Sequence, residues 1–239
     1  MTSRQTARRE QLGLIALVGG GILIVAIVVV VAMLQANAPV APSAPPSVIQ
    51  GQFADSSLPM LGSPNAPILL MEFSNFSCPG CAQYHPEVKR IIEKHVNSGA
   101  AALIFAPMIF GVGEDPSYIA AQAALCAERQ GKFWQMSDAL FEIHNLRGSR
   151  SFNRSNVTQA ARDLSLDDAA FADCLASAEI PPAMRSAAAI FEAMGGQYTP
   201  SLIYSRDGGR SWNWFVQPDG RRYDSQVPLS AVDQVVGQR

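Results

Sequence analysis

Two cysteines separated by two residues are the part of this sequence best suited to chemistry. Cys78 and Cys81 stand between an apolar run typical of a buried strand, residues 68–73, and a stretch with helical periodicity, residues 82–96. A thiolate is the reactive form of cysteine, and the unpaired N–H groups and dipole of a helix N-terminus lower the pKa of a thiol. The sequence therefore predicts a redox-active dithiol, in which Cys81 lies one turn below Cys78 and displaces whatever Cys78 has bound.

Two other interpretations of the Cys78–Cys81 pair stay open at this point. A structural disulfide across three residues closes too short a loop to restrict the unfolded chain much, so it would stabilise the fold poorly. A zinc site needs a second pair of ligands, and the chain has no second Cys-x-x-Cys. Its three histidines also lack a metal-binding spacing: His85, His95 and His144. We therefore expect neither a metal nor a cofactor.

The other two cysteines, Cys126 and Cys174, lie 48 residues apart in separate helical patterns. A disulfide between them would stabilise the fold by about 4 kcal/mol in the chain-entropy view, and it would persist in an oxidising compartment. Four cysteines allow three pairings, and this pairing is the one that leaves the reactive pair together. Two unpaired buried thiols are the alternative.

The pattern around the cysteines predicts an α/β fold. The strand at 68–73, the helix that follows it and a second apolar strand at 101–110 make a βαβ unit. Residues 115–195 are helical throughout and form an insertion. After the insertion, turn residues separate two further strands, residues 201–204 and 212–216. A last amphipathic helix is expected at residues 229–236.

An uncharged stretch near the N-terminus predicts a membrane anchor. Residues 12–34 carry no charge over 23 positions, and about 20 apolar residues span a bilayer as a helix. Three arginines in residues 1–11 place the N-terminus in the cytoplasm and the rest of the chain outside. A cleaved signal peptide ending at Ala36-Asn37-Ala38 is the alternative, but the apolar run is longer than such peptides need.

The remaining composition defines a spacer and one exported domain. Residues 35–59 are rich in Pro, Ala and Ser, which predicts an extended linker. The domain then occupies residues 60–239. Residues 55–239 carry 15 basic and 19 acidic side chains, and a nucleic-acid-binding protein needs a concentrated basic face instead. We therefore expect no nucleic-acid partner.

Several motifs together resemble one family. They are the segment 62–81 that ends in Cys-Pro-Gly-Cys, Tyr84-His85-Pro86-Glu87, and the segments 130–134, 171–175 and 198–200. With these motifs the chain resembles DsbA-type thiol–disulfide oxidoreductases over residues 61–236. The resemblance implies a thioredoxin fold, a βαβ unit plus a ββα unit, with the helical insertion between them and one transmembrane helix before them.

The resemblance also assigns roles to residues outside the cysteine pair. Pro200 would be a cis-proline that faces the dithiol, and Thr199 would present its backbone to an extended substrate chain. Pro79 and Gly80, between the two cysteines, would complete the substrate-binding surface. Glu72 would be a buried acid that relays the proton of the inner thiol; an exposed edge residue is the alternative for Glu72.

The function implied by the resemblance is that of an extracytoplasmic dithiol oxidase. Its substrates would be reduced or unfolded exported proteins, and a quinone-linked membrane partner would reoxidise it. The Pro-Gly dipeptide lacks the histidine of strongly oxidising members, which implies a less oxidising potential. A disulfide reductase or isomerase of the same fold, and a non-catalytic peptide- or metal-binding module, are the alternatives.

Overall fold

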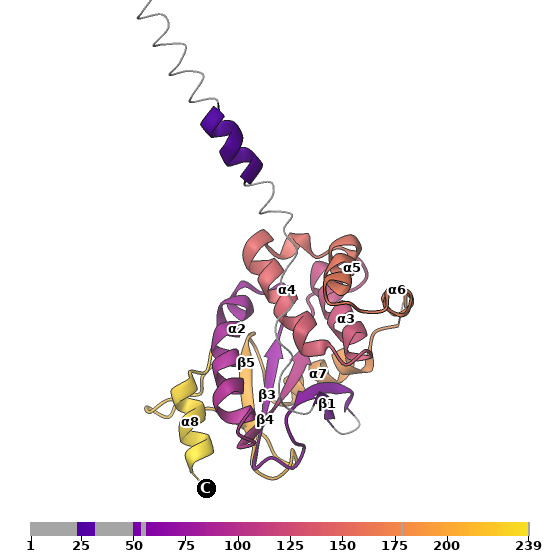
Figure 1. The fold of residues 1–239 in the computed structure, drawn as a ribbon. Helices are drawn as coiled ribbons and strands as arrows, with labels where there is room; N and C mark the ends of the chain where they lie inside the picture. Colours follow the sequence, from indigo (N-terminus) through magenta and orange to yellow (C-terminus); the bar gives the residue numbers. More distant parts are fainter. Residues whose placement is uncertain (1–22, 32–49, 54–55, 178, 239) are drawn as a thin grey trace, which may run out of the picture. The chain divides into compact units, whose positions relative to one another are not determined.

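The computed structural model describes residues 23–31, 50–53, 56–177 and 179–238 (Figure 1). The chain divides into two units between Pro39 and Val40. In the first unit residues 23–31 are helical, while the rest of the expected membrane span 12–34, residues 1–11 and the alternative cleavage site lie outside the described residues. None of the helices described is both long and apolar enough to cross a bilayer.

In the second unit, the described strands form one six-stranded sheet in the order β1-β2-β4-β3-β5-β6. Its central strands β3 and β4 are parallel, and every other neighbouring pair is antiparallel. The bounds, in chain order, are Gln50–Phe53, Leu58–Leu61, Ile68–Ser74, Ala101–Pro107, Ser201–Ser205 and Asn213–Trp214.

The two parallel strands are buried along their whole length, as expected for near-continuous apolar runs covered on both faces. Helix α2, Pro79–Ile91, connects them and continues into a π-helical turn, Ile92–Val96. Pro86 lies inside α2. Strand β4 ends at Pro107, three residues earlier than the expected strand 101–110.

Five α-helices follow β4, over the segment for which the sequence predicts a helical insertion. Three of them begin where an Asp or Asn side chain accepts a hydrogen bond from a backbone N–H of the first turn: Asp115, Asn153 and Asp167. The five helices are α3 Pro116–Glu128, α4 Phe133–Arg147, α5 Arg154–Asp163, α6 Asp168–Leu175 and α7 Pro182–Ala193, with a 3-10 turn at Ser149–Ser151. The last helix, α8 Leu229–Gly237, lies beside α2 (Figure 1).

The expected spacer 35–59 is wrong at its C-terminal end. Gln50–Phe53 forms β1 and pairs with β2, which begins at Leu58. The Phe53 ring also meets the edge of Trp212, with 6.0 Å between ring centroids. A strand that pairs with the edge of a sheet gains backbone hydrogen bonds from its neighbour. This pairing orders residues 50–53 although the composition of the segment predicts an extended linker. The second expected strand of the C-terminal hairpin, 212–216, is also shorter than predicted, since β6 spans Asn213–Trp214.

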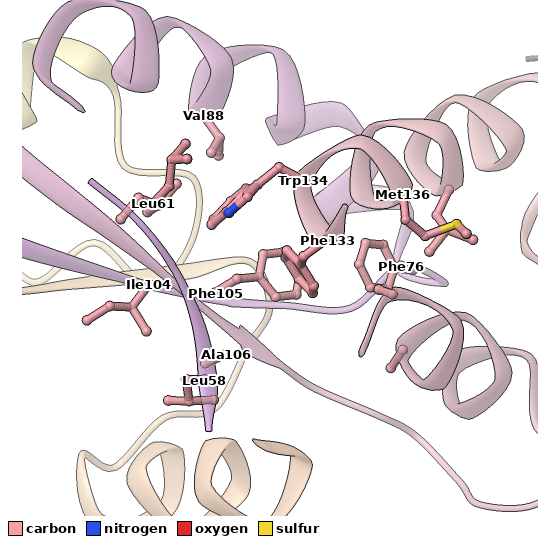
Figure 2. Packing of buried hydrophobic residues seen from close by; sticks show 14 of the residues in the cluster. Leu58, Leu61, Phe76, Val88, Ile104, Phe105, Ala106, Phe133, Trp134 and Met136 are labelled. Carbon is pink, nitrogen blue, oxygen red and sulfur yellow. The ribbon is translucent and has the colours of Figure 1, made fainter. Parts of the chain in front are cut away.

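An aromatic cluster joins the insertion to the sheet close to the cysteine motif. Phe105 of β4 stacks on Phe76 at 5.2 Å and meets Phe133 of α4 at 5.2 Å. Figure 2 shows these rings gathered between the sheet and the helix that carries Phe133 and Trp134. Phe76 lies two residues before Cys78. The core therefore fixes the loop that leads into the dithiol.

Candidate active site

The two thiols of the Cys-x-x-Cys motif lie at the start of α2, directly after the C-terminal end of β3. Cys78 is the N-cap residue of α2, and Pro79 occupies the first helical turn, where its missing N–H costs nothing. The Cys78 N–H donates to the carbonyl of Asn75 at 3.0 Å, which closes the turn between strand and helix. Both thiols are free; that of Cys78 is half-buried and that of Cys81 is buried.

The surroundings of Cys78 favour its thiolate. The Cys81 thiol donates a hydrogen bond to the Cys78 sulfur, and the backbone N–H groups of Cys81 and Gly80 and the Thr199 hydroxyl add to this. Together they outweigh partial burial and lower the pKa of Cys78 from 9.0 to about 5. Cys78 is therefore ionised at neutral pH, as the helix N-terminus in the sequence predicts.

Cys81 has the opposite electrostatics. Burial raises the pKa of its thiol, and the hydrogen bond to Cys78 and the negative charge on Cys78 raise it further. The backbone N–H of Asn75 lies 3.4 Å from the Cys81 sulfur and opposes this shift. The pair therefore consists of an outer thiolate and an inner protonated thiol, so the inner thiol must lose a proton before it can attack.

The Thr199–Pro200 peptide bond is cis and lies against the dithiol. The Cys78 Sγ is 3.5 Å from the Thr199 carbonyl oxygen, to which the thiol form of Cys78 donates. A Cβ atom added at Gly80 would lie 3.4 Å from Pro200 Cδ and 3.8 Å from the Thr199 oxygen. The expected substrate-binding residues therefore surround Cys78, and a side chain longer than a methyl group at Gly80 would have to turn away from Pro200.

Glu72 is buried on β3, with 1% of its surface exposed. Burial raises the pKa of its carboxyl group, while the charge of His85 and the hydroxyl of Ser74 lower it. The alternative that Glu72 is an exposed edge residue is therefore wrong. A buried carboxyl group with a raised pKa holds a proton closer to neutral pH than an exposed one does.

His85, one turn after Cys81, pairs with Asp138 of α4. Its Nε2 lies 2.7 Å from Asp138 Oδ1, and its ring stacks on Phe141 with 4.4 Å between centroids. Within the described part of the chain, no three His, Cys, Asp or Glu side chains are grouped so as to hold a metal ion.

The C-terminal segment contacts the active-site helix, and the sequence did not predict this contact. Gln226 Nε2 donates to the Gly80 carbonyl at 3.3 Å, and the Tyr84 hydroxyl donates to the Val227 carbonyl at 2.6 Å. These residues are more than 140 positions apart, and no local pattern in the sequence pairs them.

Cys126 of α3 and Cys174 of α6 form a disulfide with an S–S distance of 2.05 Å. The bond joins two helices of the insertion and leaves Cys78 and Cys81 as the pair of free thiols. The alternative of two unpaired buried thiols is therefore wrong.

Comparison with known proteins agrees with this geometry. A family model described as thioredoxin matches residues 56–207. A probable disulfide bond formation protein D from Bacillus anthracis is 32% identical over 92 residues, which make up 38% of this chain and 42% of that relative. The chain thus aligns with less than half of the length of this curated relative.

Solved structures cover more of the chain. A thioredoxin-like oxidoreductase from Silicibacter pomeroyi is 25% identical with a TM-score of 0.56, over 78% of this chain and 96% of the other. Oxidised BdbD from Bacillus subtilis has a TM-score of 0.58 at 16% identity, over 80% and 97% of the two chains. The second likeness concerns the fold alone.

The family match covers more than half of the chain, so this protein belongs to the thioredoxin family. Its fold, cis-proline and paired thiols are those of a DsbA-type thiol–disulfide oxidoreductase.

Replacing Glu72 with glutamine is expected to change how stability depends on pH. Folding raises the pKa of the Glu72 carboxyl group above its ordinary value of 4.5. The folded state therefore loses stability as the pH rises from 4.5 through the raised pKa, because the unfolded state gives up this proton more easily. Glu72→Gln should abolish this loss, which amounts to about 1.4 kcal/mol for each pH unit between the two pKa values. Denaturant titrations of the reduced protein at several pH values measure it.

The control for this experiment is Glu93→Gln, because Glu93 lies exposed on the π-helical turn after α2. Its stability should follow the wild-type pH dependence. A Glu72→Gln variant that follows the wild type as well would mean that folding does not perturb the Glu72 carboxyl group.

Proposed function

We propose that this protein is a dithiol oxidase, which introduces disulfides into exported proteins through Cys78 and Cys81. The observation that carries the proposal is the opposite ionisation of the two sulfurs: the half-buried Cys78 has a pKa lowered to about 5, and the buried Cys81 has a raised pKa. A thiolate stabilised on the outer cysteine favours the reduced enzyme, which makes the disulfide form a better oxidant.

The reaction begins with the oxidised Cys78–Cys81 pair. A substrate thiolate attacks Cys78 Sγ and forms a mixed disulfide, while Cys81 Sγ leaves with the electron pair of the broken bond and takes up a proton. A second substrate thiolate then attacks the substrate sulfur of the mixed disulfide. Cys78 leaves as the stabilised thiolate, the substrate gains one disulfide, and the enzyme is left reduced.

The residues around the dithiol each support one step of this sequence. The Thr199 backbone, next to the cis peptide bond, lies where an extended substrate strand would pair with it. Pro79, which is exposed, and Gly80 border the same surface. Glu72, buried with a raised pKa, supplies the proton to Cys81 when that thiolate leaves.

We also infer the location and the partners. The uncharged residues 12–34 after three arginines support a signal anchor, with the catalytic domain on the extracytoplasmic side of the cell membrane. The Cys126–Cys174 disulfide supports an oxidising compartment. Substrates would be reduced or unfolded exported proteins, and a quinone-linked membrane protein would reoxidise the enzyme.

The reduction potential of the Cys78–Cys81 couple tests the direction of transfer. Equilibration of the full chain with glutathione buffers should give a value well above about −270 mV, the potential of thioredoxin. A value near that of thioredoxin would overturn the oxidase proposal and assign the site to a reductase. Failure to equilibrate at all would leave only a binding module.

A further inference from the structure

Two buried oxygen atoms on β3, the strand that leads to the cysteine motif, have no hydrogen-bond partner among the described residues: Glu72 Oε1 and Ser74 Oγ. The two residues are 1% and 0% exposed. A buried polar atom without a partner costs free energy, so each such atom in a native fold needs an explanation. The proposed function explains Glu72 and leaves Ser74 unexplained.

The pleat of β3 places both side chains on the face of the sheet covered by α2. Phe73, between them, points to the opposite face, where its ring lies 5.0 Å from Phe191 of α7. Successive side chains of a strand alternate between faces, so Glu72 and Ser74 share the other face, with about 7 Å between their Cα atoms. That face carries Cys81.

The Cys81 sulfur lies at the end of the same strand. The backbone N–H of Asn75, the residue directly after Ser74, is 3.4 Å from Cys81 Sγ. Burial raises the pKa of both Cys81 and Glu72, and the Ser74 hydroxyl opposes burial at both groups. The Ser74 hydroxyl is therefore close enough to the inner thiol and to the buried carboxyl group to affect the pKa of each, although it completes no hydrogen bond to either in the resting structure.

We propose that the Ser74 hydroxyl passes the proton between Glu72 and Cys81; this inference rests on the proposed function. A hydroxyl group accepts one proton while it donates another. When substrate attack on Cys78 breaks the disulfide, Cys81 Sγ leaves with the bonding electron pair. The Ser74 Oγ–H proton moves to this sulfur, and Oγ takes the proton of the Glu72 carboxyl group, which becomes a carboxylate. The reverse transfer deprotonates Cys81 when it attacks a mixed disulfide.

The test compares Ser74→Ala with Ser74→Thr in the full chain. The probe is a reduced peptide with two cysteines, and the measurement is the rate of a single turnover by the oxidised protein as a function of pH. Ser74→Ala should lower the rate near neutral pH by about 100-fold, the lower end of the range for a positioned proton-transfer group. Ser74→Thr keeps a hydroxyl and should restore most of the rate.

A second comparison separates a proton relay from a structural effect. Because both residues act in one path, Ser74→Ala should cause no further loss in a Glu72→Gln background. The alkylation midpoint of Cys78 should stay near pH 5 in Ser74→Ala. The control is Ser205→Ala. Ser205 is also buried, but it lies at the end of β5 and pairs with Leu69, near the end of β3 opposite to the cysteine motif. This variant should exchange at the wild-type rate.

Two results would overturn the relay and leave the proposed function intact. One is a Ser74→Ala protein that exchanges as fast as the wild type. The other is the same fold-loss from Ser74→Ala with Glu72 present and absent, because the hydroxyl would then act independently of the carboxyl group. A wild-type protein that does not exchange with the peptide would instead overturn the proposed function, and the relay with it.

Discussion

Replacing Cys81 with alanine is expected to stop turnover and leave Cys78 joined to its partner in a stable mixed disulfide. The buried Cys81 thiol is the group placed to displace a partner from Cys78, since it donates a hydrogen bond to the Cys78 sulfur. Without it the Cys78–Cys81 disulfide cannot form, so oxidase activity should fall to the uncatalysed rate. Non-reducing electrophoresis and mass spectrometry of Cys81→Ala after incubation with an oxidised peptide measure the adduct.

The control for this prediction is Cys78→Ala, which keeps the inner thiol and removes the outer one. Cys81 is buried, with 0% of its surface exposed, and its pKa is raised. This variant should therefore form almost no adduct at neutral pH. Equal adduct formation by Cys78→Ala and Cys81→Ala would contradict the assignment of an outer nucleophile and an inner resolving thiol.

Removal of the second disulfide is expected to cost about 4 kcal/mol of stability, because the bond closes a loop of 48 residues between α3 and α6. The double variant Cys126→Ala/Cys174→Ala should unfold at a lower denaturant concentration than the wild type, with both proteins compared in their oxidised forms. Equilibrium unfolding in guanidinium chloride measures the shift.

The same variant should retain the chemistry of the active site. The alkylation midpoint of its reduced Cys78 should match that of the wild type, because no atom of the second disulfide is among the groups that shift the Cys78 pKa. A stability loss below about 1 kcal/mol would show that the bond does not stabilise this fold through chain entropy.

The features that the sequence predicts well are those that depend on residues close together in the chain. The apolar run that begins at Ile68 forms β3, and the segment 115–195, expected to be helical, contains the helices α3 to α7. The position of Cys78 at a helix N-terminus follows in the same way from the strand before it and the helical spacing after it. Local backbone preferences and hydrophobic periodicity suffice for these elements.

The features that the sequence did not predict depend on contacts between distant segments. Strand β1 is ordered by pairing with β2 and by the contact of Phe53 with Trp212, which is far away in the chain. The contact of Gln226 with Gly80 joins residues 146 positions apart. Ser74 is an ordinary strand residue in the sequence, and its place between Glu72 and Cys81 follows only from how α2 packs on the sheet.

The central claim is that the half-buried Cys78 is a thiolate stabilised by its surroundings, and the pH dependence of its alkylation tests this most directly. The reduced full chain would be treated with iodoacetamide over a range of pH, and the rate of modification at Cys78 read by mass spectrometry of its peptide. We expect a modification rate that is constant around neutral pH and has its midpoint near pH 5. Below pH 5 the rate should fall about tenfold for each pH unit, because only the thiolate reacts. A midpoint at about pH 8.5, which is the pKa of a free cysteine, would contradict the account.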